Sequence, residues 1–208
     1  MSNLTLSKHF TQEDYEIVER TILYEGVFRL VRNQIRFRLF DGDWSQTVSR
    51  EVLERMSAAA ILPYDPHLDQ VVLIEQFRPG ALAQPSSPWL LEVVAGVYSS
   101  NEKPDEVAIR EAQEEAACEI NEIQLIQDYF VSPGGSNEYL HLFCGKVNAS
   151  AIGGIHGLKS ENEDIRAFAL PAEDAFKMLQ RGEIKTAPAI IALQWLQLNR
   201  AWLKALWQ

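Results

Sequence analysis

The positions of apolar and polar residues divide the chain into two regions. Residues 16–55 alternate apolar and polar side chains imperfectly, with a turn signal at Asp41-Gly42. Alternation of this kind is typical of strands that expose one face to solvent. The apolar runs that follow are shorter and continuous, which predicts more deeply buried strands. We therefore expect an N-terminal β region, residues 1–55, and a larger α+β domain, residues 56–208.

The second region combines predicted strands and predicted helices. Strands are expected at the apolar runs of residues 57–64, 71–78, 89–96, 123–132, 138–147 and 165–171. Helices are expected at residues 105–117, 172–181 and 187–206. Pro104 and Gly182 support two of these boundaries, because proline suits a first helical turn and glycine often follows a last one. The polar stretch of residues 148–164 is expected to be a loop.

Composition narrows the possible functions. The chain has 208 residues, 47% hydrophobic and 23% charged, as in an ordinary soluble globular protein. Its net charge of −10 makes a nucleic acid or an anionic membrane an unfavourable partner. Two cysteines provide neither a disulfide framework nor a clustered metal motif. Since no signal sequence and no run of 18 apolar residues is visible, we expect a cytoplasmic protein with a small-molecule partner.

The segment from Arg110 to Ile120, REAQEEAACEI, carries three glutamates on one side of a predicted helix. Glu111, Glu114 and Glu115 stand at i, i+3 and i+4, where like charges destabilise a helix by roughly 0.2–0.5 kcal/mol per pair. Alanines on a neighbouring side would let this helix pack closely on strands. Taken alone, the pattern favours a solvent-exposed acidic stripe.

A longer pattern surrounds these glutamates and changes that interpretation. The run from Gly96 to Cys118, GVYSSNEKPDEVAIREAQEEAAC, resembles the signature of the Nudix hydrolases. The matching positions are Gly96, Glu102, Arg110, Glu111, Ala112, Glu114 and Glu115. Their spacing needs a strand, a loop and a helix in that order, as predicted here. The resemblance implies an α+β fold, the Nudix-type α/β/α sandwich with a mixed β-sheet, preceded by the N-terminal β region.

The resemblance also implies a metal centre. Hard cations such as Mg²⁺ bind oxygen ligands, often a few carboxylates together with substrate phosphates. By the family pattern, Glu111 and Glu115 are the main helix-borne ligands, and Glu114 also lies near the metal. The backbone carbonyl of Ala95 contributes from the strand end. The implied cofactor is Mg²⁺, with Mn²⁺ as a possible substitute.

Three other motif positions are expected to be structural. Glu102 would stabilise its loop, Gly96 would end the strand, and Arg110 would orient a glutamate by ion pairing. One position departs from the family pattern, because Ala117 stands where the family has glycine, followed by Cys118. Alanine could adopt the left-handed cap at a cost of roughly 1 kcal/mol or more, or the helix could run slightly longer.

The stretch FVSPGGSNE, which ends at Glu138, concerns the substrate. Taken alone, Pro-Gly-Gly between two strands predicts a turn. Together with its distance from the motif, this stretch resembles the corresponding sequence in the subgroup that cleaves ADP-ribose. The implied function is Mg-dependent hydrolysis of the diphosphate bond of ADP-ribose to AMP and ribose 5-phosphate. Two alternatives stay open: hydrolysis of another nucleoside diphosphate sugar such as GDP-mannose, and a Nudix-fold sensor that binds ADP-ribose without cleaving it.

The resemblance to this subgroup extends from about Tyr24 to Leu198. In the subgroup, the N-terminal strands exchange contacts across a homodimer and help to build the adenosine pocket, so we expect a homodimer with shared active sites. The positions that match substrate-binding residues are Phe28, Arg50, Arg78, Ser132, Gly134 and Glu138. The stretch YEGVF offers Val27 and then Phe28 for the aromatic that stacks on the base, which leaves that assignment open.

The acidic loop KSENEDI supplies the expected base. Taken alone, it reads as a solvated loop. By the resemblance, Glu161 corresponds to the general base that activates water, and Glu163 to a nearby carboxylate that can reach a metal. A carboxylate bound to Mg²⁺ is too acidic to accept a proton, so a base separate from a ligand such as Glu115 makes chemical sense. The reverse assignment of Glu161 and Glu163 also stays open.

Overall fold

The computed structural model describes residues 10–158 and 162–207, and the chain divides into two compact units. The first unit combines Met1–Arg55 with Val131–Glu138, and the second combines Met56–Phe130 with Tyr139–Gln208. The expected N-terminal region therefore groups with a short segment that the sequence analysis left in the second domain.

The first unit is built on a three-stranded antiparallel sheet. Its strands, in spatial order, are β1 (Tyr15–Glu25), β2 (Arg29–Phe37) and β3 (Val48–Glu54), preceded by the 3₁₀ turn η1 (Gln12–Asp14). Every residue of β1 is exposed. Val31 is the one buried apolar side chain among the described residues of this unit. Strand pairing, and not a hydrophobic core, therefore accounts for most of the contacts within this sheet.

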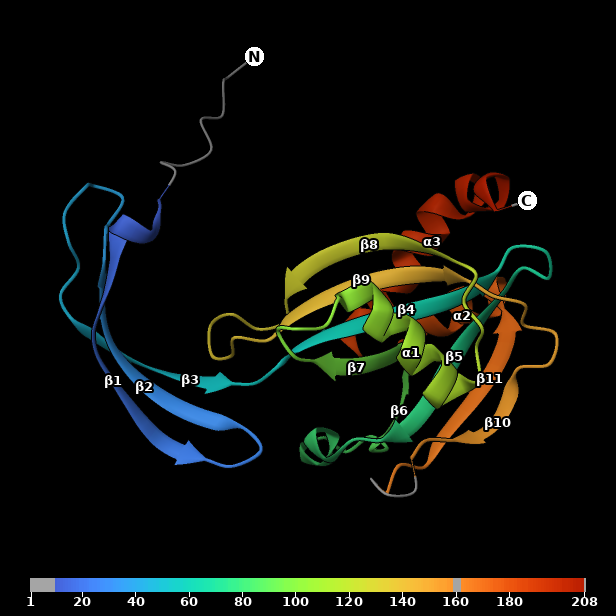
Figure 1. Ribbon diagram of the computed structural model, residues 1–208, viewed down its shortest axis with the longest axis horizontal. Helices are drawn as coiled ribbons and strands as arrows, with labels where there is room; N and C mark the ends of the chain where they lie inside the picture. The colour runs from blue at the N-terminus through green and yellow to red at the C-terminus, as the bar shows by residue number, and fades with distance from the viewer. Residues whose placement is uncertain (1–9, 159–161, 208) are drawn as a thin grey trace, which may run out of the picture. The chain divides into compact units, whose positions relative to one another are not determined.

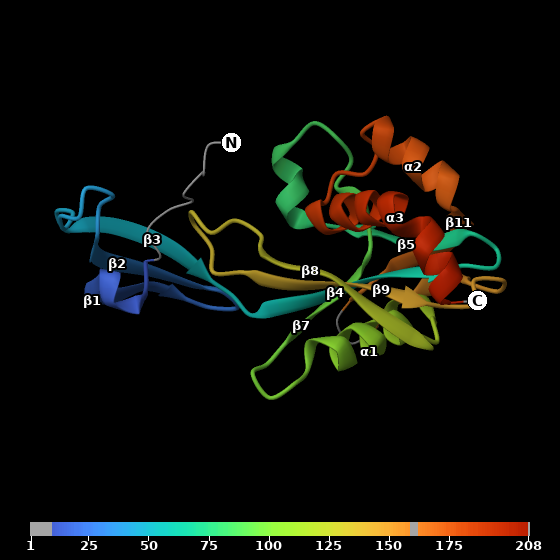
Figure 2. The same cartoon turned by 90° about the horizontal axis from the view of Figure 1, so that it is seen from above.

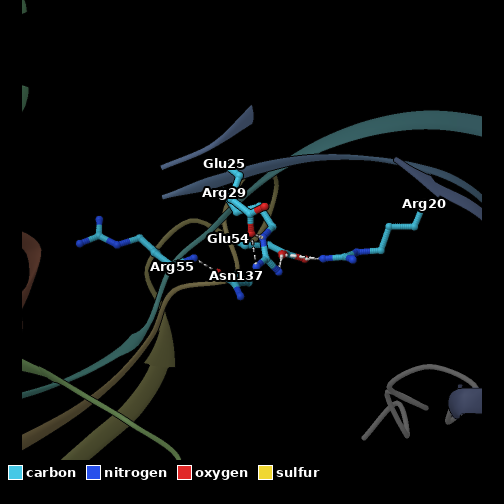
Figure 3. A network of polar contacts seen from close by, with 6 residues as sticks. All are labelled: Arg20, Glu25, Arg29, Glu54, Arg55 and Asn137. Atoms are coloured by element: carbon cyan, nitrogen blue, oxygen red, sulfur yellow. Dashed lines mark hydrogen bonds and ion pairs between the residues drawn. The ribbon is translucent and has the colours of Figure 1, made fainter. Parts of the chain in front are cut away.

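Arginine–glutamate pairs connect the three strands of the first unit, as Figure 3 shows. Glu54 on β3 accepts two hydrogen bonds from Nη2 of Arg20 on β1, at 2.9 and 2.7 Å. It also lies 3.8 Å from Nη1 of Arg29, whose Nη2 contacts Glu25 at 2.6 Å. These side chains are partly exposed, so each pair contributes about 0–1 kcal/mol.

Residues 131–138 are attached to the end of β3. The backbone N–H of Arg55 donates to the Asn137 side chain at 2.8 Å, a bond drawn in Figure 3. The N–H of Leu53 donates to the carbonyl of Gly135 at 2.9 Å, and the N–H of Asn137 donates back to Leu53 at 3.3 Å. The segment therefore belongs to this unit through backbone bonds to a regular strand.

The second unit contains an eight-stranded mixed sheet and helices (Figure 1). Its strands are β4 (Ser57–Asp65), β5 (Gln70–Phe77), β6 (Trp89–Glu92), β7 (Val94–Tyr98), β8 (Glu122–Phe130), β9 (Tyr139–Lys146), β10 (Gly153–His156) and β11 (Ile165–Pro171). Its helices are η2 (Pro79–Ala83), α1 (Pro104–Ala116), α2 (Ala172–Gln180) and α3 (Ala187–Leu206). The strand order is β10-β11-β5-β4-β9-β8, with β6 paired to β5 and β7 to β4. Strands β4 and β9 are parallel, and the other pairs are antiparallel.

Helices cover both faces of this sheet. Figure 2 shows α2 and α3 on one side and α1 on the other. One core cluster joins sheet residues such as Leu142 to Phe176 and Leu193 of α2 and α3. The other joins Ile61 and its neighbours to Ala112 and other small residues of α1. Strands β4 and β5 are apolar at successive positions because both their faces are covered. The predicted α/β/α sandwich with a mixed sheet is confirmed.

Two strands differ from the expectation. The apolar run of residues 89–96 forms β6 and β7, which pair with different neighbours on either side of the buried Val93. Apart from Glu92, the residues of this run are apolar or glycine in both strands, so the hydrophobic pattern does not indicate the change of partner. Residues 153–156 form the edge strand β10 inside the predicted loop, where Gly153 and Gly154 are exposed and give no apolar period.

Helix α1 ends at a left-handed alanine. Ala117 has φ 50° and ψ 32°. The N–H of Ala117 donates to the carbonyl of Gln113 at 3.1 Å, which is the bond of the αL cap motif, and the N–H of Cys118 donates to the carbonyl of Ala112 at 2.9 Å. Of the two outcomes considered for this position, the cap is the one observed. Its cost for a residue with a Cβ is roughly 1–2 kcal/mol.

Asp69 anchors α3 to the turn between β4 and β5. Its carboxylate pairs with Arg200, lies 3.0 Å from Nζ of Lys204, and accepts the hydroxyl of the buried Tyr64 at 2.8 Å. Hydrogen bonding from Arg200 is the main cause that holds the pKa of Asp69 well below its usual range. Trp207, just after α3, is buried in the same core.

None of the described helices is long and apolar enough to span a membrane.

Candidate active site

The glutamate side of α1 faces Ala95 and Gly96 of β7. A Cβ added to Gly96 would overlap with the carboxylate of Glu111. Glycine at this position therefore lets the strand approach the helix closely enough for a glutamate to lie over its backbone.

Glu115 is the most buried carboxylate of α1. Its residue is 4% exposed, and its Oε2 accepts the backbone N–H of Ala95 at 3.1 Å. Burial raises the pKa of Glu115 to about 8, against the effect of the Ala95 hydrogen bond. Repulsion from Glu111 and Glu163 adds to the rise, and Arg78 opposes it. A carboxylate in these surroundings is costly to ionise unless a cation accompanies it.

Two more carboxylates lie within electrostatic reach of Glu115. Burial raises the pKa of Glu111, while Arg110 lowers it and both Glu114 and Glu163 raise it further. The Oε2 of Glu163 accepts the backbone N–H of Leu158 at 3.1 Å, so a local bond orients this side chain. Glu111, Glu115 and Glu163 therefore form one group of interacting anions, contributed by α1 and by the segment before β11.

The remaining motif residues make local contacts. Arg110 pairs with Glu111 at 2.9 Å and with Glu114 at 3.1 Å, along one side of the helix. Glu102 accepts both the backbone N–H and the hydroxyl of Ser99 at 3.0 Å. Arg110 therefore partly neutralises the charge of the two glutamates, and Glu102 closes the loop between β7 and α1.

Arg78 follows β5 and belongs to the same unit. Its Nε donates to Oε2 of Glu92 on β6 at 2.8 Å. Burial raises the pKa of Glu92, and Arg78 is the main opposing influence. Because Arg78 also lowers the pKa of Glu115, its guanidinium lies within electrostatic reach of two buried carboxylates.

The other predicted substrate-binding residues lie in the first unit. They are Phe28, Arg50, Ser132, Gly134 and Glu138. Arg55 brings two of them together, since its guanidinium lies 5.0 Å from the ring centroid of Phe28 and its Nη1 lies 3.2 Å from Oε2 of Glu138. Val27, the other candidate for stacking, is 96% exposed.

Arg50 and the Ser132 turn make fewer contacts. Nη1 of Arg50 donates to the carbonyl of Ser49 at 2.8 Å. The carbonyl of Ser132 accepts the N–H groups of Gly135 and Ser136, which closes a turn around Gly134. A Cβ at Gly134 would meet nothing within 4 Å. The expected base, Glu161, lies outside the described residues.

The sequence model of the NUDIX domain matches residues 53–204. The chain belongs to the Nudix family.

Relatives of this Nudix chain match it over nearly its whole length. The ADP-ribose pyrophosphatase of Haemophilus influenzae is 44% identical over 204 residues, 97% of this chain and 94% of the relative. The ADP-ribose pyrophosphatase of Escherichia coli (strain K12) is 44% identical over 198 residues, 95% of each. A GDP-mannose pyrophosphatase of Escherichia coli O1:K1 is 34% identical over 188 residues, 88% of this chain and 95% of the relative.

A solved structure, that of an ADP compounds hydrolase, has the same fold. Its TM-score is 0.69 at 18% identity, and the match covers 97% of this chain and 99% of the other. At this identity the likeness concerns the fold alone.

Nudix hydrolases generally use divalent metal ions, and the residues around Glu115 fit such an ion. The buried carboxylates of Glu111 and Glu115 have raised pKa values, so a bound cation would offset their repulsion. Within residues 10–158 and 162–207, no three His, Cys, Asp or Glu side chains are grouped tightly enough to hold an ion alone. A backbone oxygen, substrate oxygens and water would have to complete the shell, as is usual for Mg²⁺.

Sequence reasoning missed two residues that contact predicted site residues, Glu92 in the second unit and Arg55 in the first. Glu92 was counted as part of an apolar run, although a lone carboxylate inside WLLEVV is itself a signal. Arg55 was taken as a boundary, and its contacts with Phe28 and Glu138 depend on the attachment of residues 131–138 to β3. No sequence pattern predicts that attachment.

Proposed function

We propose that this Nudix chain hydrolyses the diphosphate bond of ADP-ribose to AMP and ribose 5-phosphate with the help of a divalent cation. One observation carries the proposal. A group of carboxylates, centred on the buried Glu115, lies beside Ala95 of β7 in a chain that is 44% identical to ADP-ribose pyrophosphatases over nearly its whole length.

The residues of α1 would hold the metal. Glu111 and Glu115 are the proposed ligands, with Glu114 and Glu163 nearby and the carbonyl of Ala95 as a backbone donor. When bound, Mg²⁺ (or Mn²⁺ in its place) would stabilise the charge that develops on the phosphate oxygens. Gly96 keeps the space for these carboxylates free, as the overlap of a Cβ with Glu111 indicates.

The proposed proton transfer uses Glu161. This carboxylate would accept a proton from water as the water oxygen bonds to phosphorus and the phosphorus–oxygen bond of the diphosphate bridge breaks. Arg78 would bind the diphosphate, because its Nη groups are free of hydrogen bonds to other described residues while its Nε is held by Glu92. A cation is needed there, since the chain carries a net charge of −10 and the substrate is an anion.

The first unit has the side chains for recognition of the rest of the substrate. Phe28 offers an aromatic face, with Arg50, Ser132, Gly134 and Glu138 as the proposed polar and backbone contacts. We propose that the sheet of this unit pairs with a second copy of the chain, so that the enzyme is a homodimer with shared active sites. The exposure of every residue of β1 supports this assignment.

We also propose a cytoplasmic location. Cys118 and Cys144 are both free and buried, as suits a reducing compartment.

A second candidate is hydrolysis of GDP-mannose, which the 34% identical relatives favour. The test is a panel of ADP-ribose, GDP-mannose, ADP-glucose and NADH, assayed at matched concentration with Mg²⁺ and with Mn²⁺. We expect ADP-ribose to have the highest kcat/KM. A tenfold advantage of another member would overturn the assignment, and tight binding of ADP-ribose without turnover would point to a sensor.

A further inference from the structure

Arg78 is held from one side only. Its Nε donates to Glu92, and its side chain makes no other hydrogen bond or ion pair with residues 10–158 and 162–207. A guanidinium carries five N–H donors in a planar fork, so four N–H groups on the two Nη atoms remain available. The Arg78 side chain is 42% exposed, whereas that of Glu92 is 13% exposed. The edge of the Arg78 guanidinium that binds Glu92 is therefore its buried edge.

The charged carboxylate of Glu92 is energetically unfavourable at its position. It lies on β6 opposite Ile74 of β5, within an otherwise apolar run, and burial raises its pKa. Replacing a buried ion pair by apolar residues is often neutral or stabilising, so stability alone does not explain a carboxylate here. Its one strong contact is the charge-assisted hydrogen bond to Arg78, which fixes the plane of the guanidinium.

Gln76 is a second buried polar residue beside this pair. It is 8% exposed and lies in β5 two positions before Arg78, whose backbone directly after the strand is still extended, so both side chains point to the same face of the sheet. The side-chain amide of Gln76 interacts with Glu92 and helps to hold down its pKa, although its Nε2 makes no hydrogen bond of ordinary geometry with the described residues. Most buried polar groups in proteins have a hydrogen-bond partner, so a buried amide directed at Glu92 is consistent with a role in holding that carboxylate.

The carboxylates of α1 explain why the orientation of Arg78 needs to be fixed. Arg78 acts electrostatically on Glu115, so an unrestrained guanidinium would be attracted to the carboxylates of α1. The hydrogen bond of Nε to Glu92 fixes the orientation of the guanidinium against this attraction and leaves the Nη edge open to a phosphate oxygen.

We propose that Glu92, supported by Gln76, is a positioning residue that orients Arg78 toward the diphosphate of the substrate. This inference rests on the proposed function. It assigns Glu92 no contact with substrate, and it predicts that Glu92 matters only through Arg78.

The test is a double-mutant cycle on the full-length chain with ADP-ribose. We expect Arg78→Ala to lower kcat/KM by about 100-fold and Glu92→Gln by about tenfold, mainly through KM. The double variant should be no worse than Arg78→Ala alone. The matched control is Glu75→Gln, the same substitution on the adjacent strand β5 in a pair with Arg166, which should leave kcat/KM unchanged. The affinity for ADP-ribose with metal removed by EDTA should follow the same pattern.

Each other outcome identifies what fails. If the wild-type chain neither binds nor hydrolyses ADP-ribose, the proposed function is wrong. If Arg78→Ala has no effect, the role of Arg78 in binding substrate is wrong. If Arg78→Ala acts as expected but the Glu92→Gln effect is absent or simply adds to it, the positioning role of Glu92 is overturned. Equal thermal stability of Glu92→Gln and Glu75→Gln separates positioning from a general loss of structure.

Discussion

The two units of this protein organise their apolar residues in opposite ways. In the second unit, successive apolar residues of β4 and β5 are buried between helices on both faces of the sheet. In the first unit, Val31 is the one buried apolar side chain among the described residues, and β1 leaves Ile17, Val18 and Ile22 about half exposed. The second unit meets the ordinary requirement for independent folding, and the first has a sheet without a core.

The candidate functional residues also differ between the two units. The second unit carries the buried carboxylates of α1 and the Arg78–Glu92 pair. The first carries Phe28, Arg55 and Glu138, whose groups suit binding more than bond cleavage. The proposed function therefore assigns the reaction to one unit and the selection of the substrate to the other, and four experiments test this division.

The largest expected effects are on catalysis. Glu161→Gln should lower kcat by about 10²–10⁴-fold, the usual contribution of a general base, while KM and the Mg²⁺ midpoint barely move. Glu115→Gln should also abolish most activity, but with a shift of the metal requirement to higher concentration, because it removes a charged ligand. Steady-state kinetics across a Mg²⁺ titration distinguishes the two. If Glu161→Gln mainly raises the Mg²⁺ requirement, the roles of Glu161 and Glu163 are exchanged.

Truncating one apolar side chain in each unit measures the difference in packing. Leu142→Ala in the buried core should lower the free energy of unfolding by about 2–5 kcal/mol. Ile22→Ala on β1 should cost less than about 1 kcal/mol in dilute solution, because the side chain is 46% exposed. Urea denaturation at several protein concentrations provides the measurement. A cost for Ile22→Ala that grows with concentration would show that a second copy covers β1.

Removing residues 1–50 tests the division of labour directly. We expect a folded monomer whose kcat is little changed and whose KM for ADP-ribose rises by at least about tenfold, the equivalent of one lost charged hydrogen bond. Analytical ultracentrifugation and kinetics check the two parts, and circular dichroism confirms folding. Phe28→Ala in the full chain should raise KM in the same direction without changing the assembly. A truncated chain that stays dimeric with an unchanged KM would refute shared sites.

The smallest expected effect concerns the end of α1. Ala117→Gly should stabilise the protein by up to about 1 kcal/mol, because glycine adopts the left-handed cap without a Cβ penalty. The matched control is Gln113→Gly, an exposed position inside the same helix, which should destabilise by about 0.5–1 kcal/mol. Opposite shifts in Tm are the expected result, and a loss of stability in both would mean that Ala117 makes contacts that offset its strain.

The sequence was most informative where one element decides the outcome. Pro104 and Gly182 marked helix ends within a residue or two, and the deep burial of β4 and β5 followed from their continuous apolar runs. The sequence was least informative where distant segments meet. The attachment of residues 131–138 to β3 depends on backbone bonds between Leu53 and this segment and on the bond from the N–H of Arg55 to the Asn137 side chain. Backbone bonds leave no trace in the side-chain pattern, and one asparagine in a turn does not predict such a distant partner.

The candidate site shows the same limit. The spacing of Glu111 and Glu115 predicted a shared helix side, because a helix has a fixed period. Burial of Glu115 and the pairing of Arg78 with Glu92 depend on how strands align, which spacing does not determine. Ala117 gave two possible outcomes, since the cost of a left-handed alanine is close to the gain from a closed cap.

The burial of Trp207 and Leu203 at the end of α3 has a consequence for biosynthesis. These side chains complete the core on one face of a sheet whose first strand, β4, begins at Ser57. Most of the strands therefore leave the ribosome before the helix that covers them, and the nascent chain carries an open apolar surface until Trp207 emerges. The Asp69–Arg200 pair also has to wait for α3, so chaperone dependence and misfolding during translation should respond to changes in α3 more than to changes in α1.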